Sequence, residues 1–72
     1  MMLNNIAVLI DGDNASSKNI GAILNKISEF GTITLKKIYG DWSQTNLSSW
    51  QEAILQYAID PMQQFAYVKG KN

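Results

Sequence analysis

The chain has 72 residues, and its six lysines balance six acidic residues to give a formal net charge of zero. This length allows one small domain, and the balanced charge does not favour strong non-specific binding to nucleic acid by this chain alone. Cysteine and histidine are both absent, which excludes a disulfide framework and the usual zinc sites. A metal site would therefore need oxygen ligands, which favours Mg²⁺, Mn²⁺ or Ca²⁺.

The longest unbroken apolar run covers residues 6–10 and is far shorter than the roughly 20 residues that a membrane-spanning helix needs. The first five residues carry no basic side chain, so a secretory signal is not expected. We expect a cytoplasmic protein that does not associate with a membrane.

Two elements are predicted in the first thirty residues. Residues 6–10 are apolar and mostly β-branched, and Asp11-Gly12 follows them, which predicts a strand buried on both faces in a parallel sheet. Apolar residues then recur at intervals of three and four. This spacing predicts a helix over about residues 17–30, with Ser16 or Ser17 at its start and Gly31 after its end.

Three further elements complete the chain. Residues 32–39 are rich in β-branched side chains and predict a second strand, followed by a polar loop. An apolar stripe that includes Trp50 and Tyr57 predicts a second helix, which Asp60-Pro61 is expected to end. Residues 64–68 are expected to form a third strand before the polar residues 69–72.

The predicted order is β-α-β-α-β, which is typical of an α/β fold with a parallel sheet and right-handed crossovers. A first strand as apolar as residues 6–10 needs neighbours on both edges and helices on both faces. Three strands and two helices barely supply them, so we expect residues 1–72 to be the first half of a larger, doubly wound, three-layer domain.

Three acidic residues follow the predicted strands at the edge where parallel sheets bind ligands. Asp11 and Asp13 come after the first strand, and Asp41 comes after the second. Two carboxylates on one turn can share a hard cation, which could activate water against a phosphodiester. Asn14 can hold a carboxylate or a water molecule in place. Asp, Gly and Asn are also ordinary turn residues, so a turn without a metal is the alternative interpretation.

Several other side chains are weaker candidates. Ser16 lies at a helix N-terminus, which favours anions, and Lys69 and Lys71 follow the third strand, so all three could contact phosphate. Trp50 and Tyr57 could stack on bases, but their helical stripe favours core packing. Trp42 lies on no such stripe and is expected either to cover the site or to pack at a sheet edge.

Residues 6–14 resemble the opening of the NYN domains, a PIN-like group that includes the LabA-like proteins. The segment Tyr39-Gly40-Asp41-Trp42 is similar to the end of that family's second strand. Residues 65–68 followed by 69–72 are similar to its third strand and the segment after it. The resemblance covers nearly the whole chain in the family's order.

This resemblance implies a PIN-like, Mg²⁺- or Mn²⁺-dependent ribonuclease. Asp11 matches the family's first metal-binding Asp, and Asn14 matches its Asn. Asp13 matches a common acidic position, and Asp41 is a further candidate for the cofactor site. Members of the family continue into further acidic residues that complete the metal shell, and residues 1–72 contain none of these. We therefore expect this chain alone to be inactive or weakly active.

Two other functions remain open. An apolar strand followed by Asp-x-Asp also occurs in the haloacid dehalogenase superfamily, where Asp11 would be the nucleophile and Asp13 the general acid. Against this, Ala15 replaces the expected Thr or Val, and the path to the first helix is too short for the usual flap. A non-catalytic interaction module is the other alternative. Self-association, as a homodimer or a higher oligomer, is expected through an exposed sheet edge.

Overall fold

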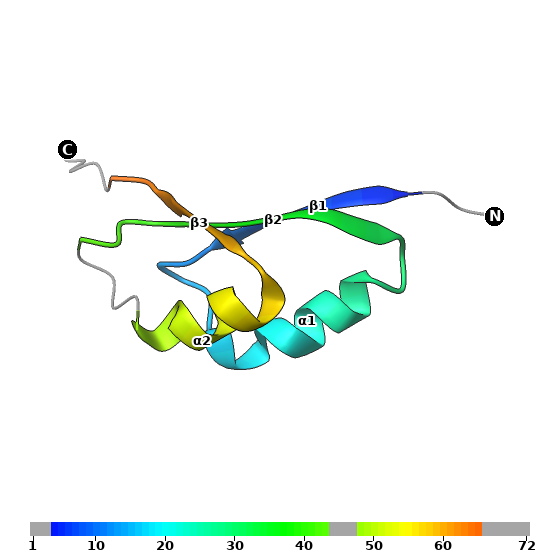
Figure 1. Cartoon of the computed structure of the whole chain (residues 1–72), viewed down its shortest axis with the longest axis horizontal. Helices are drawn as coiled ribbons and strands as arrows, with labels where there is room; N and C mark the ends of the chain where they lie inside the picture. The colour runs from blue at the N-terminus through cyan, green and yellow to red at the C-terminus, as the bar shows by residue number, and fades with distance from the viewer. Residues whose placement is uncertain (1–3, 44–47, 66–72) are drawn as a thin grey trace.

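The computed structural model describes residues 4–43 and 48–65 (Figure 1). It confirms the predicted alternation of strands and helices. The elements, in chain order, are β1 (Asn5–Asp11), the 3-10 turn η1 (Ser17–Asn19), α1 (Ile20–Ile27), β2 (Thr32–Gly40), α2 (Ser48–Tyr57) and β3 (Asp60–Gln63).

The three strands form one parallel sheet in the order β1-β2-β3. Each crossover therefore steps in the same direction across the sheet. Crossovers of one hand that step in one direction leave their helices on the same face. Figure 1 shows this arrangement, with α1 and α2 both lying beneath the sheet.

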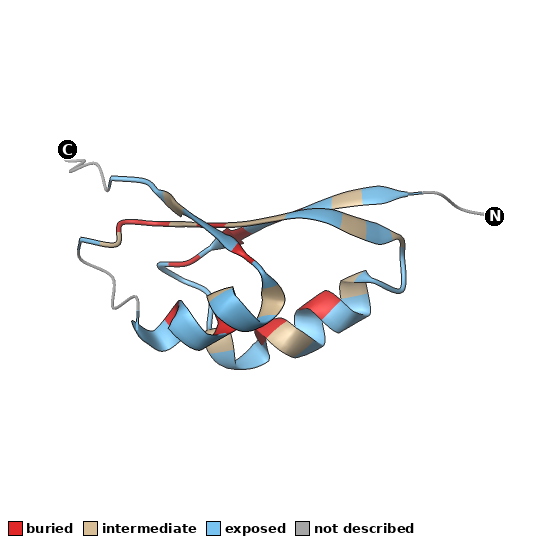
Figure 2. Ribbon diagram, in the orientation of Figure 1, coloured by how far each residue is buried: buried red, intermediate tan, exposed pale blue. Residues whose placement is uncertain are grey.

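The core lies between the sheet and the two helices, and Figure 2 shows buried positions on their facing sides. Trp50 and Ile38 are the largest fully buried side chains. Tyr57 is half-buried against the same cluster, so the predicted core packing of Trp50 and Tyr57 is confirmed. The other buried apolar residues are Val8, Ile10, Ile20, Leu24, Ala53 and Ile59.

The expectation that the first strand is buried on both faces is wrong for the described residues. Val8 and Ile10 face the helices and are buried, whereas Leu9 is 62% exposed on the opposite face. Leu35 of β2 is 37% exposed, and Ala7, its partner in the β1–β2 register, is exposed too. Of the expected three layers, the described residues therefore form two, because both helices cover the same face.

The boundaries of three elements differ from those predicted. The first helix starts as the 3-10 turn η1 and ends at Ile27, short of residue 30. The second helix ends at Tyr57 because Ala58 takes the left-handed conformation, with φ of 54°. β3 follows at once, so Asp60-Pro61 opens a strand where we expected a helix end.

β3 thus precedes the predicted strand at residues 64–68, and residues 64 and 65 are not in a strand. Pro61 is tolerated in β3 because a strand at the edge of a sheet has backbone N–H groups that no neighbour needs. Residues 66–68 lie outside the described residues. Among the described helices, none has both the length and the hydrophobicity to cross a bilayer.

Candidate metal site at the carboxyl edge of the sheet

The turn that leaves β1 is held tightly against the end of β2. Asp11 lies beside Tyr39 in the register, and the Gly12 N–H donates to the Tyr39 carbonyl at 2.7 Å. A Cβ at Gly12 would lie 2.9 Å from Ile38 Cγ1 and 2.9 Å from the Trp42 ring. Only a glycine fits here without displacing the core, so the position of the following residues is fixed by packing.

Asp11 organises this turn. Its carbonyl accepts hydrogen bonds from the backbone N–H of Asn14 and Ala15 at 3.2 and 2.8 Å. Its carboxylate accepts one from Asn14 Nδ2 at 2.7 Å and one from the Asp13 N–H at 3.3 Å. The predicted role of Asn14 in holding a carboxylate thus has a geometric basis. Asp11 remains exposed, so its carboxylate is open to solvent and ligands.

Asp13 points towards the end of β2. The backbone N–H of Asp41 lies 3.4 Å from Asp13 Oδ2, a long hydrogen bond. A Cβ at Gly40 would lie 3.2 Å from Asp13 Oδ1, so the carboxylate rests against the bare backbone of that glycine. The structure therefore brings Asp13 to Gly40, which ends β2, and to Asp41, which follows it, while the Asp11 carboxylate bonds within its own turn.

Asp41 differs from the other two acidic residues because it is buried, with 4% of its surface exposed. Its Oδ1 accepts hydrogen bonds from the backbone N–H of Ser43, the Ser43 hydroxyl and Gln63 Nε2. Three donors on one oxygen compensate for much of the hydration that the carboxylate loses on burial. They also leave that oxygen little capacity for a cation.

Gln63 is the residue of this site that the sequence analysis missed. It ends β3 beside Gly40, and its Nε2 lies 2.9 Å from Asp41 Oδ1. Its Oε1 accepts from the Trp42 N–H at 3.2 Å, so one amide side chain holds two consecutive residues. The sequence offered no local signal for Gln63, because its place at the carboxyl edge depends on β3 running over residues 60–63 and not over the predicted residues 64–68.

Trp42 covers the tight turn. Its indole Nε1 donates to the Met62 carbonyl at 3.1 Å. Its ring lies within contact distance of positions where side chains at Gly12 and Gly40 would stand. Of its two expected positions, Trp42 takes the one at the edge of the sheet, and its ring there lies close to the backbone of Gly12 and Gly40.

The NYN domain family model matches residues 5–72. The chain belongs to this family. The family is nuclease-like, and the match covers the β1 turn, the end of β2 and β3. No curated protein and no solved structure matches the chain.

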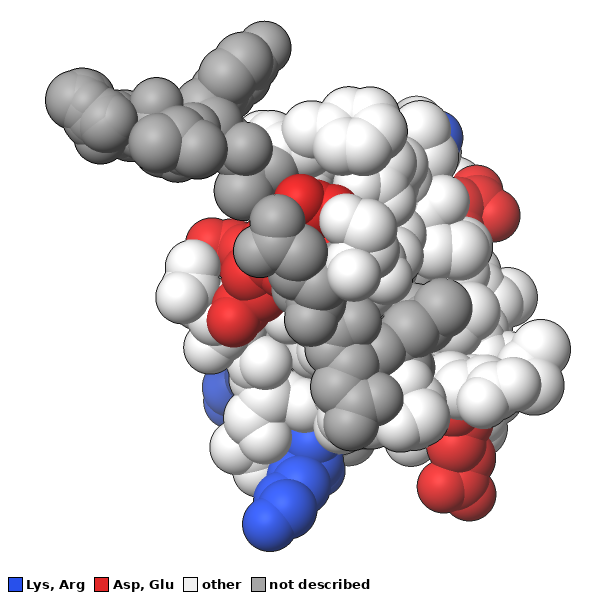
Figure 3. All heavy atoms as spheres, turned by 90° about the vertical axis from the view of Figure 1, so that its left-hand side faces the viewer, with Lys and Arg blue, Asp and Glu red and all other residues white. Residues whose placement is uncertain are grey.

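Three acidic residues of this NYN domain, Asp11, Asp13 and Asp41, lie at the carboxyl edge of the sheet. Figure 3 views the end towards which the strands run and shows a group of acidic side chains left of centre, with basic side chains below the group and other acidic side chains apart at the right. Within residues 4–43 and 48–65, no three His, Cys, Asp or Glu side chains come together as a metal-binding group. The exposed carboxylates of Asp11 and Asp13 still suit Mg²⁺, which binds through one or two carboxylates and keeps several waters.

The predicted phosphate contacts have different outcomes. Ser16 is exposed at the start of η1, and its hydroxyl accepts from the Lys18 N–H at 3.3 Å, so it caps this turn. Lys69 and Lys71 lie outside the described residues.

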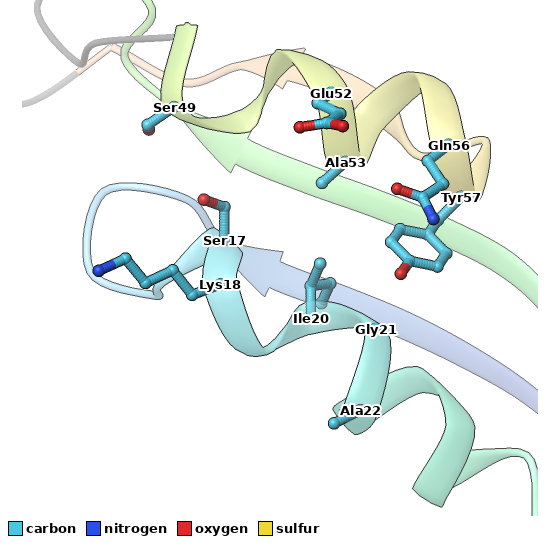
Figure 4. A pocket seen from close by; sticks show the side chains of 10 residues that line it. All are labelled: Ser17, Lys18, Ile20, Gly21, Ala22, Ser49, Glu52, Ala53, Gln56 and Tyr57. Atoms are coloured by element: carbon cyan, nitrogen blue, oxygen red, sulfur yellow. The ribbon is translucent and has the colours of Figure 1, made fainter.

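An open groove of about 480 Å³ runs between the start of the first helix and α2. Figure 4 shows Lys18 on one wall and Glu52 and Gln56 on the other. Tyr57 closes one end, since a Cβ at Gly21 would lie only 2.3 Å from its hydroxyl oxygen. The groove carries one basic and one acidic side chain on its walls, so its charge favours neither an anion nor a cation.

Proposed function

We propose that this NYN domain is the part of a metal-dependent ribonuclease that supplies Asp11 and Asp13 as oxygen ligands for Mg²⁺ or Mn²⁺. The observation that carries the proposal is the exposure of both carboxylates on a rigid turn at the carboxyl edge of a parallel sheet. Membership of a nuclease-like family supports RNA as the substrate.

The roles of the side chains follow from their contacts. Asn14 orients the Asp11 carboxylate through a 2.7 Å hydrogen bond, and Asp13 is held against the end of β2. A bound divalent cation would activate a water molecule and offset negative charge on the phosphodiester. Ser16, Lys69 and Lys71 are proposed phosphate contacts. We place Asp41 behind Asp13 in this site, because its Oδ1 already accepts three hydrogen bonds.

We also propose that residues 1–72 form the N-terminal part of a single NYN domain in a cytoplasmic protein. Two observations on the described residues support this: two exposed carboxylates make a sparse metal site, and one face of the sheet carries the uncovered side chains of Leu9 and Leu35. Further acidic residues would complete the metal site, and a second helical layer would cover the exposed face of the sheet.

Mn²⁺ titration followed by thermal unfolding tests the metal site. Wild type should gain stability with rising Mn²⁺ concentration, and Asp11→Asn should not, because the amide cannot offer a negatively charged ligand. Asp60→Asn is a matched control, since Asp60 is an exposed acid that opens β3 beside Lys37, before the strand reaches the carboxyl edge. A wild-type unfolding temperature that does not change with Mn²⁺ concentration would refute the metal site.

Incubation with single-stranded RNA and with a small phosphomonoester tests the substrate class. Mn²⁺-dependent cleavage of RNA that is lost in Asp11→Asn would support the ribonuclease function. Hydrolysis of the phosphomonoester alone would favour the dehalogenase chemistry instead.

Self-association through β1 is a further part of the proposal. Among the described strands, β1 pairs only with β2, and its run from Ile6 to Ile10 has neither a charge nor a proline to discourage pairing. β3, at the other edge, is four residues long and includes Pro61. Light scattering should show concentration-dependent association that Leu9→Lys reduces. A wild-type monomer at high concentration would contradict it.

A further inference from the structure

Asp41 and Gln63 meet at the ends of β2 and β3, and Asp13 reaches the same point from the β1 turn. We infer that Gln63 and Asp41 are positioning residues that hold the end of β2 so that its backbone N–H orients the carboxylate of Asp13. This inference rests on the proposed role of Asp13 as a metal ligand. It adds two residues that would act on the metal only through Asp13.

Hydrogen bonds from β3 and from the residues after β2 fix the Asp41 side chain. Gln63 Nε2 donates to Asp41 Oδ1 at 2.9 Å, and the Ser43 backbone N–H donates to the same atom at 3.2 Å. The residue is 4% exposed, so water competes little for these bonds. Hydrogen bonds to a buried charged group are among the stronger ones in proteins.

Hydrogen bonds to the end of β3 also fix the backbone around Asp41. Gln63 Oε1 accepts from the Trp42 N–H at 3.2 Å, and the Gln64 N–H donates to the Gly40 carbonyl at 2.8 Å. The residues before and after Asp41 are thus both tied to the end of β3. The peptide group that carries the Asp41 N–H therefore has little freedom to rotate.

The backbone N–H of Asp41 in turn contacts Asp13, the proposed metal ligand. The Asp41 N–H is 3.4 Å from Asp13 Oδ2, so a small rotation of that peptide would break the hydrogen bond. Asp13 is exposed, and an exposed carboxylate adopts several rotamers unless a partner selects one. Selecting one rotamer before a cation arrives lowers the entropy lost on binding.

The experiment compares Gln63→Ala and Gln63→Glu with the neighbouring control Gln64→Ala, which keeps the backbone N–H bond to Gly40. Gln63→Glu retains an acceptor for the Trp42 N–H but cannot donate to Asp41. Mn²⁺ affinity is measured on the full chain, and circular dichroism confirms that each variant is folded. Asp13→Asn shows separately whether Asp13 binds the ion.

Both Gln63 variants should bind Mn²⁺ about tenfold more weakly than wild type, which is the lower end of the effect for groups that orient metal ligands. Gln64→Ala should bind it as wild type does. Binding that weakens in Asp13→Asn but stays at the wild-type level in both Gln63 variants would overturn the inference and leave the proposed function intact.

A second measurement needs no metal. Amide hydrogen exchange at Asp41, expressed relative to exchange at buried Ile38, separates local opening from a general loss of stability. This ratio should rise in both Gln63 variants and stay constant in Gln64→Ala. An unchanged ratio would overturn the inference. If wild type binds no Mn²⁺, the metal-site proposal fails, and this ratio alone decides whether Gln63 fixes the Asp41 backbone.

Discussion

Asp11 ends β1 and Asp41 directly follows the neighbouring strand β2, yet their surroundings differ. Asp11 is exposed, and its carboxylate accepts from two groups of its own turn, Asn14 Nδ2 and the Asp13 N–H. Asp41 is 4% exposed and accepts from Ser43 and from Gln63 of β3. The Asp11 carboxylate thus accepts hydrogen bonds only from its neighbours in the sequence, among the contacts described above. The Asp41 carboxylate also links the end of β2 to β3, 22 residues further along the chain.

The difference separates two uses of a carboxylate at a strand end. An exposed group with local partners can exchange water for a ligand at little cost to the fold. A buried group with several donors contributes to the fold, and its removal leaves those donors without an acceptor. Substitution of Asp41 should therefore lower the stability of the fold. Substitution of Asp11 should mainly weaken ligand binding.

Asp41→Ala should have the largest effect on stability. It leaves the Ser43 N–H and Gln63 Nε2 without their acceptor, so we expect a loss of about 3 kcal/mol in the free energy of unfolding. Urea denaturation checks this. Asp41→Asn keeps an acceptor oxygen and should lose less. Equal urea midpoints for wild type and Asp41→Ala would show that the buried Asp41 carboxylate does not stabilise the fold.

Gly12→Ala should follow, with a loss of about 2 kcal/mol, because the new methyl group would stand 2.9 Å from Ile38 in the core. Gly40→Ala is the matched variant. Its methyl group would meet the side chains of Asp13 and Trp42 at 3.2 Å, and both can move, so about 1 kcal/mol is expected. A larger loss for Gly40→Ala than for Gly12→Ala, measured by thermal melting, would show that the turn is less rigid than its packing indicates.

Asn14→Ala removes the side chain that holds the Asp11 carboxylate. The bond is exposed, so we expect about 1 kcal/mol of lost stability. Mn²⁺ affinity should fall as well, because the carboxylate is no longer oriented. Asn19→Ala is a suitable control, since Asn19 makes no side-chain cap hydrogen bond at the start of α1. Equal Mn²⁺ affinities in the two variants would show that Asn14 does not orient Asp11.

Asp11→Asn should have the smallest effect on stability. The amide oxygen can still accept from Asn14, and the group is exposed, so we expect a change within about 0.5 kcal/mol in the absence of metal. Its effect should emerge only on adding Mn²⁺. A large loss of stability without metal, seen by calorimetry, would mean that Asp11 and Asp41 have the same structural role.

The sequence predicted most of the fold because local signals agreed with the tertiary structure. The β-branched run before Asp11 formed β1, and the helical spacing around Ile20 and Leu24 formed α1. It failed at β3, where Asp60-Pro61 reads locally as a helix terminator. The determining factor was tertiary, since β3 is an edge strand that needs no N–H from Pro61.

The burial of β1 was overestimated for a similar reason. An apolar run shows that a strand can be buried on both faces, but the topology decides which faces receive helices. Here the order β1-β2-β3 leaves Leu9 on the uncovered side. At the site, the spacing of acids along the chain placed Asp11, Asp13 and Asp41 at one edge. The contact of Asp41 with Gln63, 22 residues away, depends on the register of β3, which no local pattern contains.

The position of Trp42 has an optical consequence. Trp42 lies half-buried over Gly12 and Gly40, whereas Trp50, the other tryptophan, is 2% exposed in the core. The chain thus carries two intrinsic fluorophores in different environments. In a Trp50→Phe variant, emission would come from Trp42 alone, and a paramagnetic ion such as Mn²⁺ arriving at Asp13 should quench it. Trp42 fluorescence would therefore report Mn²⁺ binding at the edge of the sheet without an added label.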